Sequence, residues 1–270
     1  MKISANHPLA IGCIIIFFIA LFVIFGPLFT SYSQHSQNLA ISLSSPSIQH
    51  PLGTDYYGRD VLTRLIYGGR ISLGIAVFSA IIAVLIGTVL GLFTGYYGGF
   101  PDLIIMRFVD VMLAFPRLFI VLLIIGLGGS SIPALIWVIA LFSWMEIARI
   151  VRSEVMSLKN RTYVKSARAQ GFSVNRILFR HILPNTINPV IVATVLSIST
   201  IILVESGLSF LGLGVQPPNA SWGSILNDAK IDPLGTWWLS VPAGFLILFS
   251  VIGFNLIADG ITEELDPRKN

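Results

Sequence analysis

Long apolar runs with almost no charge dominate this sequence and limit what it can fold into. A helix needs about 20 mostly apolar residues to cross the hydrocarbon core of a membrane. Several windows reach that length, in a chain of 270 residues that is 54% hydrophobic and only 11% charged. Soluble domains average about 25% charged residues. The sequence therefore predicts an all-α membrane protein.

Hydropathy predicts six transmembrane helices. The apolar windows lie at residues 9–29, 71–97, 103–127, 132–150, 188–211 and 237–258. The first run is longer than the roughly 7–15 residues of a secretory signal, so we expect an uncleaved helix. We divide the chain into a first helix with an outer loop (1–70), a five-helix core (71–258) that contains the loop 152–185, and a tail (259–270).

The distribution of basic residues predicts the orientation of these helices. With the N-terminus inside, thirteen of the 17 Lys and Arg residues lie in the cytoplasm, and Arg59, Arg64, Arg70 and Lys230 lie outside. Cationic residues near span ends are retained in the cytoplasm. We therefore expect both termini and the loop 152–185 inside, and the net charge of +4 needs no nucleic acid to explain it.

Glycines in and near the predicted helices have two expected roles, close helix packing and helix breaking. Gly87, Gly91 and Gly95 are four residues apart and predict a face for close helix packing. Three Gly-Gly pairs, which begin at residues 68, 98 and 128, are expected to break helices near span ends.

The loop 152–185 is predicted to form two short helices around Gly171, which can adopt positive φ. Ala167 lies four residues before it, so the first helix offers a small-residue surface. The second helix has one apolar face at spacing i, i+3, i+4 and i+7, formed by Val174, Ile177, Leu178 and His181. Pro184 is expected to end that helix.

This loop resembles the coupling loop of ABC importer permeases. The family pattern is Glu-Ala-Ala, three residues, Gly, nine residues, Ile, one residue, Leu-Pro. Lys165 and Ser166 replace the first two residues, and His181 stands at the Ile position. The pattern falls on Lys165, Ser166, Ala167, Gly171, His181, Leu183 and Pro184.

Four further segments resemble the dipeptide, oligopeptide and nickel importer branch, and its second, C-type permease subunit. They are HPLGTD at 50–55 with GRDVL at 58–62, DVMLAFP at 110–116, LSFLGLG at 208–214 with Trp222-Gly223, and LDPR at 265–268. The resemblance implies a type I importer fold in a bacterial inner membrane. It also implies a short peptide, nickel or another small solute as cargo.

The resemblance implies a complex with a homologous second permease, two ATPase subunits and an extracytoplasmic solute-binding protein. In that family the loop docks into a groove on the ATPase, and the ATPases bind ATP and Mg²⁺. Our hypothesis is that Ala167 and Gly171 form the seat and Arg168 a rim contact. The chain has no Gly-Lys dipeptide, so the common phosphate cradle is missing, and we expect no enzyme activity and no cofactor of its own.

Glu205 lies within the predicted span 188–211, where a carboxylate usually faces water or protein. Two roles stay open, a place in the substrate path or a hydrogen bond between helices. Glu146 is expected to pair with Arg149 or Arg152, and Asp110 to form an ion pair.

Asp55 and Asp60 lack the ligand spacing of a calcium loop, so helix capping is the preferred role. No histidine pairing suggests a metal site. A secondary ion-coupled transporter is the main alternative, although such carriers often show two matching halves that this sequence lacks.

Overall fold

The computed structural model describes residues 7–265, which are almost entirely helical and contain no β-strand. The α-helices are α1 (His7–Phe25), α2 (Val61–Tyr97), α3 (Gly99–Ala114), α4 (Arg117–Gly128), α5 (Ile132–Leu158), α6 (Thr162–Ala169), α7 (Val174–Ile177), α8 (Leu183–Phe210), α9 (Trp222–Asp228) and α10 (Trp237–Glu264). A π-helical turn at Leu178–Ile182 joins α7 to α8. This architecture confirms the all-α membrane class.

Five of these helical segments are long and apolar enough to cross a membrane. The predicted span at 103–127 is instead broken into α3 and α4, which meet at an angle of 89°. Phe115 is extended (φ −90°, ψ 142°) because a residue before proline avoids the helical region. Pro116 therefore turns a single predicted span into a bent pair.

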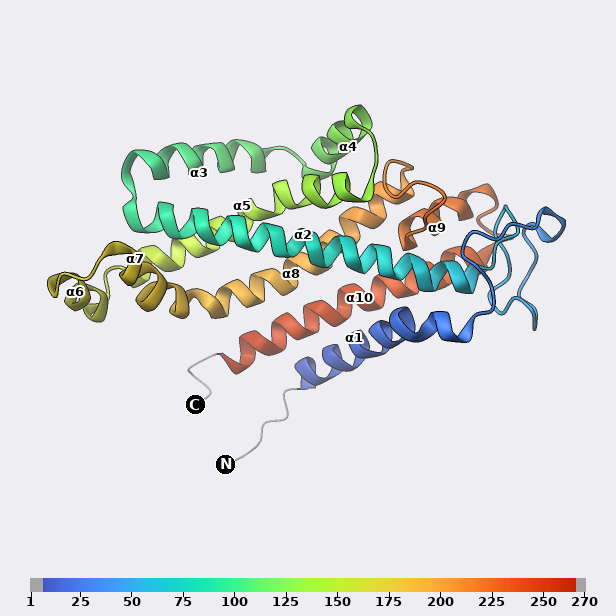
Figure 1. The fold of residues 1–270 in the computed structure, drawn as a ribbon, viewed down its shortest axis with the longest axis horizontal. Helices are drawn as coiled ribbons and strands as arrows, with labels where there is room; N and C mark the ends of the chain where they lie inside the picture. The colour runs from blue at the N-terminus through green and yellow to red at the C-terminus, as the bar shows by residue number, and fades with distance from the viewer. Residues whose placement is uncertain (1–6, 266–270) are drawn as a thin grey trace.

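The helices form an elongated bundle (Figure 1). The hairpin of α6 and α7 lies at one end, and the loop before α2 lies with α9 at the other. Helices α1 and α10 lie side by side and antiparallel, close enough that a Cβ on Gly12 would stand 2.7 Å from the carbonyl oxygen of Gly253. Small residues thus attach α1 to the rest of the bundle.

The central contact is between α2 and α5. A Cβ built on Gly87 would lie 2.7 Å from the Trp144 carbonyl oxygen, and one on Gly91 would lie 2.7 Å from Val151 Cβ. Gly95 approaches Val155 in the same way, with 2.7 Å to its Cβ. The predicted packing seam is therefore confirmed, and its partner is α5.

Helix α2 begins ten residues earlier than predicted and crosses the proposed boundary between residues 70 and 71. Asp60 caps it, accepting hydrogen bonds from the Thr63 amide (2.8 Å) and hydroxyl (2.7 Å). The expectation that Gly68-Gly69 breaks a helix is wrong, because both residues are buried within α2. Gly69 instead allows close approach of Trp222, whose Cζ2 atom would lie 2.8 Å from an added Cβ.

Candidate functional site

Helix α6 carries the centre of the predicted coupling loop at one end of the bundle (Figure 1). Its inner face is apolar, with Val164 fully buried and Ala167 only 5% exposed. Ser166 and Arg168 lie on the exposed side. The Arg168 guanidinium carbon lies 5.4 Å from the Tyr96 ring centre, so a cation–π contact rests this arginine on the end of α2.

Gly171 ends α6 in the left-handed conformation that the sequence predicted, with φ +78°. Its amide donates to the Arg168 carbonyl (3.0 Å), and the Phe172 amide donates to the Ala167 carbonyl (3.2 Å). These two bonds are those of a Schellman cap, which satisfies the last carbonyls of a helix. No atom lies within 4 Å of a Cβ built on Gly171, so backbone conformation, and not space within this chain, favours glycine here.

The second half of the loop is continuous with α8. Of the predicted apolar face, Ile177 and Leu178 are buried and Val174 and His181 are half-buried, while Arg176 and Arg180 are exposed. The expectation that Pro184 ends this helix is wrong. The Leu183 amide donates to the Leu178 carbonyl across the π-turn, and Leu183 and Pro184 form the first turn of α8, where proline needs no amide partner.

His181 lies on the inner side of that turn. Its ring stacks on the Phe172 ring, with 6.0 Å between ring centres. The Arg176 guanidinium carbon also lies over the Phe172 ring, 4.2 Å from its centre. The His181 Nε2 atom is buried without a hydrogen-bond partner among the described residues. The histidine therefore helps to fix the angle between the two short helices.

Glu205 is completely buried where α8, α2 and α9 meet. Its carboxylate accepts hydrogen bonds from the hydroxyl of Ser72 on α2 (2.9 Å) and of Ser209 one turn along α8 (2.7 Å). The Trp222 amide at the start of α9 donates to the same Ser72 hydroxyl (3.2 Å). This geometry has the features of a hydrogen bond between helices.

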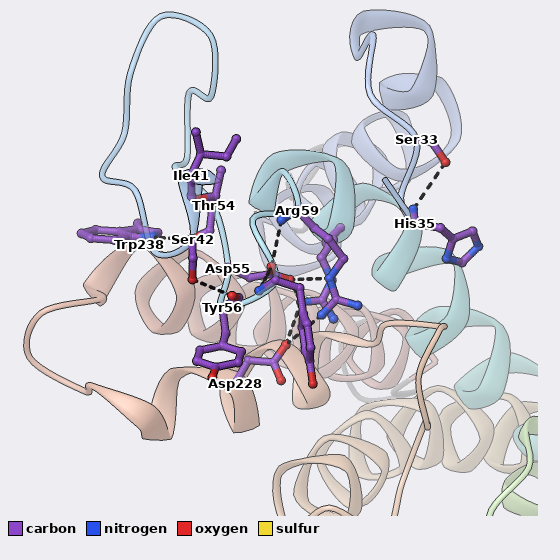
Figure 2. A network of polar contacts seen from close by, with 12 residues as sticks. Ser33, His35, Ile41, Ser42, Thr54, Asp55, Tyr56, Arg59, Asp228 and Trp238 are labelled. Atoms are coloured by element: carbon purple, nitrogen blue, oxygen red, sulfur yellow. Dashed lines mark hydrogen bonds and ion pairs between the residues drawn. The ribbon is translucent and has the colours of Figure 1, made fainter. Parts of the chain in front are cut away.

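A buried ion cluster ties the outer loop to two helices at the opposite end. We call Asp55, Arg59, Arg64 and Asp228 the outer ion cluster; Figure 2 labels three of its members, and Arg59 Nη2 lies 3.8 Å from Asp228 Oδ2. Asp55, which is 0% exposed, accepts from Arg59 Nε (2.6 Å) and Arg64 Nη1 (2.5 Å). Arg64 also donates to Asp228 of α9 (2.7 Å).

Helix capping, the role preferred for both outer aspartates, holds for Asp60 alone. The Asp55 carboxylate also accepts the Tyr57 and Arg59 amides at 2.9 Å each, which closes a tight loop before α2. No spacing rule pairs Arg64 with Asp228, 164 residues away, so sequence reasoning missed this contact.

Three ion pairs link α3 and the start of α4 to α5, and we call them the charge ladder. Arg117 pairs with Glu146 (2.5 Å), Asp110 with Arg149 (3.0 Å), and Asp102 with Arg152 (2.5 Å). Asp110 forms an ion pair as predicted, but with Arg149 and not with Arg107 or Arg117, between which it lies in the sequence. The prediction that Glu146 pairs with Arg149 or Arg152 is wrong, because the bend at Pro116 brings Arg117 next to it.

Comparison with known proteins decides the family. Residues 87–270 match the family model described as "Binding-protein-dependent transport system inner membrane component". The chain belongs to this family. Residues 2–46 of this family member also match the "N-terminal TM domain of oligopeptide transport permease C".

Similar proteins cover nearly the whole permease. The dipeptide transport system permease protein DppC of Alkalihalophilus pseudofirmus is 40% identical over 99% of this chain and 88% of its own length. The oligopeptide transport system permease protein OppC of Escherichia coli K12 is 40% identical over 97% and 88%. The glutathione transport system permease protein GsiD of Pectobacterium atrosepticum is 41% identical over 83% and 74%.

The chain is thus a membrane permease subunit of an ATP-binding-cassette importer and is not itself an enzyme, since ATP hydrolysis in these systems lies in separate subunits. This finding removes the secondary transporter as an alternative. Family membership also implies a bacterial inner membrane location and a complex with other subunits.

Proposed function

We propose that this permease forms half of a translocation pathway for short peptides. The other components are a homologous second permease, two ATPase subunits that bind ATP and Mg²⁺, and an extracytoplasmic solute-binding protein. Relatives named for dipeptide, oligopeptide and glutathione transport support a peptide cargo over nickel.

We further propose that α6 is the element that meets an ATPase subunit. The observation that carries this is the shape of α6, whose inner face is fixed by Val164 and Ala167 while its outer face projects from the end of the bundle (Figure 1). Because Ala167 is buried in this chain, we assign it to seating α6 on the bundle. The docking surface then consists of Ser166, Arg168 and Gly171, with Leu183 and Pro184 setting its angle to α8.

Glu205 fits a structural role better than direct contact with cargo. Its two serine partners satisfy the carboxylate and join α8 to α2. We therefore propose that Glu205 holds these helices together in the conformation described here.

Reconstituted transport tests the proposed function. The permease, its second permease and the ATPases are placed in proteoliposomes with the binding protein outside, and uptake of labelled tripeptides and of nickel is measured. We expect ATP-dependent tripeptide uptake and no uptake of free nickel. ATP-dependent nickel uptake without peptide uptake would assign the complex to the other cargo.

Cross-linking tests the docking surface separately. A cysteine at Ser166 should cross-link to a cysteine in the ATPase subunit, whereas a cysteine at Gln37 in the outer loop should not. Equal cross-linking at both positions, or at neither, would rule out α6 as the docking element.

A further inference from the structure

The charge ladder stands where charges are expensive. Glu146 is fourteen residues from the start of the 27-residue helix α5, about 21 Å along it at 1.5 Å per residue. A hydrocarbon core about 30 Å thick that begins at the start of α5 contains Glu146, about two-thirds of the way toward the end that carries α6. The cost of charge in hydrocarbon predicts that this face meets water or polar groups.

In the Arg117–Glu146 pair of the charge ladder, the exposed fractions of the two side chains show which one faces outward. The Glu146 side chain is 54% exposed, while its partner Arg117 is 18% exposed. Ionisable side chains within a membrane almost always face a bundle interior or water. The pair presents a carboxylate, held by an arginine behind it, to the space beside α5.

A cavity of about 900 Å³ lies next to this face, between α5, α8 and α10. Ile150 and Glu154 line it from α5, one and two turns beyond Glu146 on the same side of the helix. Asn185 and Asn188 line it from α8, and Thr262 from α10. The cavity therefore combines apolar walls with hydrogen-bonding groups, and it lies toward the end of the bundle that carries α6.

We propose that the face of α5 from Glu146 to Glu154 lines the inner half of the translocation pathway, and that the Glu146 carboxylate contacts the ammonium end of a passing zwitterionic peptide. The inference rests on the proposed function as a peptide importer. Charge complementarity argues for this occupant, since a peptide carries an ammonium group and the pair exposes mainly its carboxylate. The exposed carboxylate of Glu146 receives the ammonium group, and Arg117 positions that carboxylate.

Photo-cross-linking during transport tests where the peptide passes. Benzoylphenylalanine replaces Ile150, or Phe17 as a control that is 59% exposed on the far helix α1, in the complete complex in proteoliposomes. The probe is a radiolabelled tripeptide that the wild-type complex imports. We expect peptide adducts at position 150 that require ATP and the binding protein, and none at position 17.

Two results would overturn this inference. One is that position 150 forms adducts only with the second permease or lipid, and the other is equal peptide labelling at both positions. Wild-type uptake without adducts at position 150 overturns this inference alone. Absence of wild-type peptide uptake overturns the proposed function, and this inference falls with it.

Charge variants test the contact itself. Glu146→Gln and Arg117→Gln should each lower tripeptide uptake about tenfold, the loss of one charge-assisted contact, while ATP hydrolysis stimulated by loaded binding protein changes less than about twofold. The exchange Arg117→Glu with Glu146→Arg keeps an ion pair but inverts the exposed charge, so it should not restore uptake. Full restoration by the exchange would show that the pair is purely structural and would refute the proposal.

Discussion

Asp55 is the residue on which the outer end of the molecule most depends, since both arginines of the outer ion cluster donate to its buried carboxylate. Removing one partner of a buried ion pair costs about 3–5 kcal/mol. We therefore predict that Asp55→Ala lowers the thermal unfolding temperature of the purified permease by several degrees. Glu264→Ala, at an exposed acid near the end of α10, is the control and should leave that temperature unchanged.

Substitutions at Gly171 can separate the effect of backbone conformation on transport from the effect of side-chain size. Alanine pays roughly 1–2 kcal/mol in the left-handed region, whereas asparagine enters it more readily despite its larger side chain. We predict that Gly171→Asn keeps most ATP-driven uptake, while Gly171→Ala and Gly171→Val lose more of it and remain inserted in the membrane. If Asn proves more harmful than Ala, size at the docking surface decides, and the importance of the φ angle is refuted.

At the scale of elements, the glycine seam between α2 and α5 makes the sharpest stability prediction. In Gly91→Leu the new side chain would start 2.7 Å from Val151 Cβ and from the Ala148 carbonyl oxygen, so the two helices must separate. Overpacking of this kind typically costs 1–3 kcal/mol. We expect a lower unfolding temperature in detergent, whereas Gly74→Leu, with no atom within 4 Å of its Cβ, should show no such change.

Elements were predictable from sequence where local patterns determine them. The seam of Gly87, Gly91 and Gly95 follows from spacing, and the end of α6 follows from Gly171. The start of α2 did not follow, because Arg64 and Gly68 suggest a loop until the buried partners of Arg64 are known. The bend at Pro116 was missed for a related reason, since the apolar character of residues 103–127 continues unchanged through it.

At the scale of the whole molecule, the orientation with both termini inside rests on the distribution of Lys and Arg, and accessibility can test it. After Cys13→Ser, we predict that Lys165→Cys reacts with a membrane-impermeant maleimide only in opened vesicles, whereas Gln37→Cys reacts in intact cells. The reverse labelling pattern would show that the chain has the opposite orientation in the membrane. Both positions are exposed, so burial within the chain does not limit the reaction.

The candidate site was only partly visible in the sequence. Motif spacing located α6 and its glycine, because a short helix that ends at a left-handed glycine has a local sequence pattern. The ladder partners Arg117 and Glu146 are 29 residues apart and meet only through the α3–α4 bend, so their pairing depends on tertiary geometry. The inward direction of Ala167 likewise depends on the bundle on which α6 packs.

The continuity of the helix through the π-turn has a mechanical consequence. Residues Val174–Phe210 form one 37-residue apolar segment, a rod about 55 Å long at the usual helical rise. If α6 meets an ATPase subunit as proposed, a push applied there passes into α8 through continuous helix, and the π-turn and Pro189 are the two places where this helix is most easily bent. The far end of α8 carries Glu205, so a movement of this segment would reach the contacts of its carboxylate with Ser72 and Ser209.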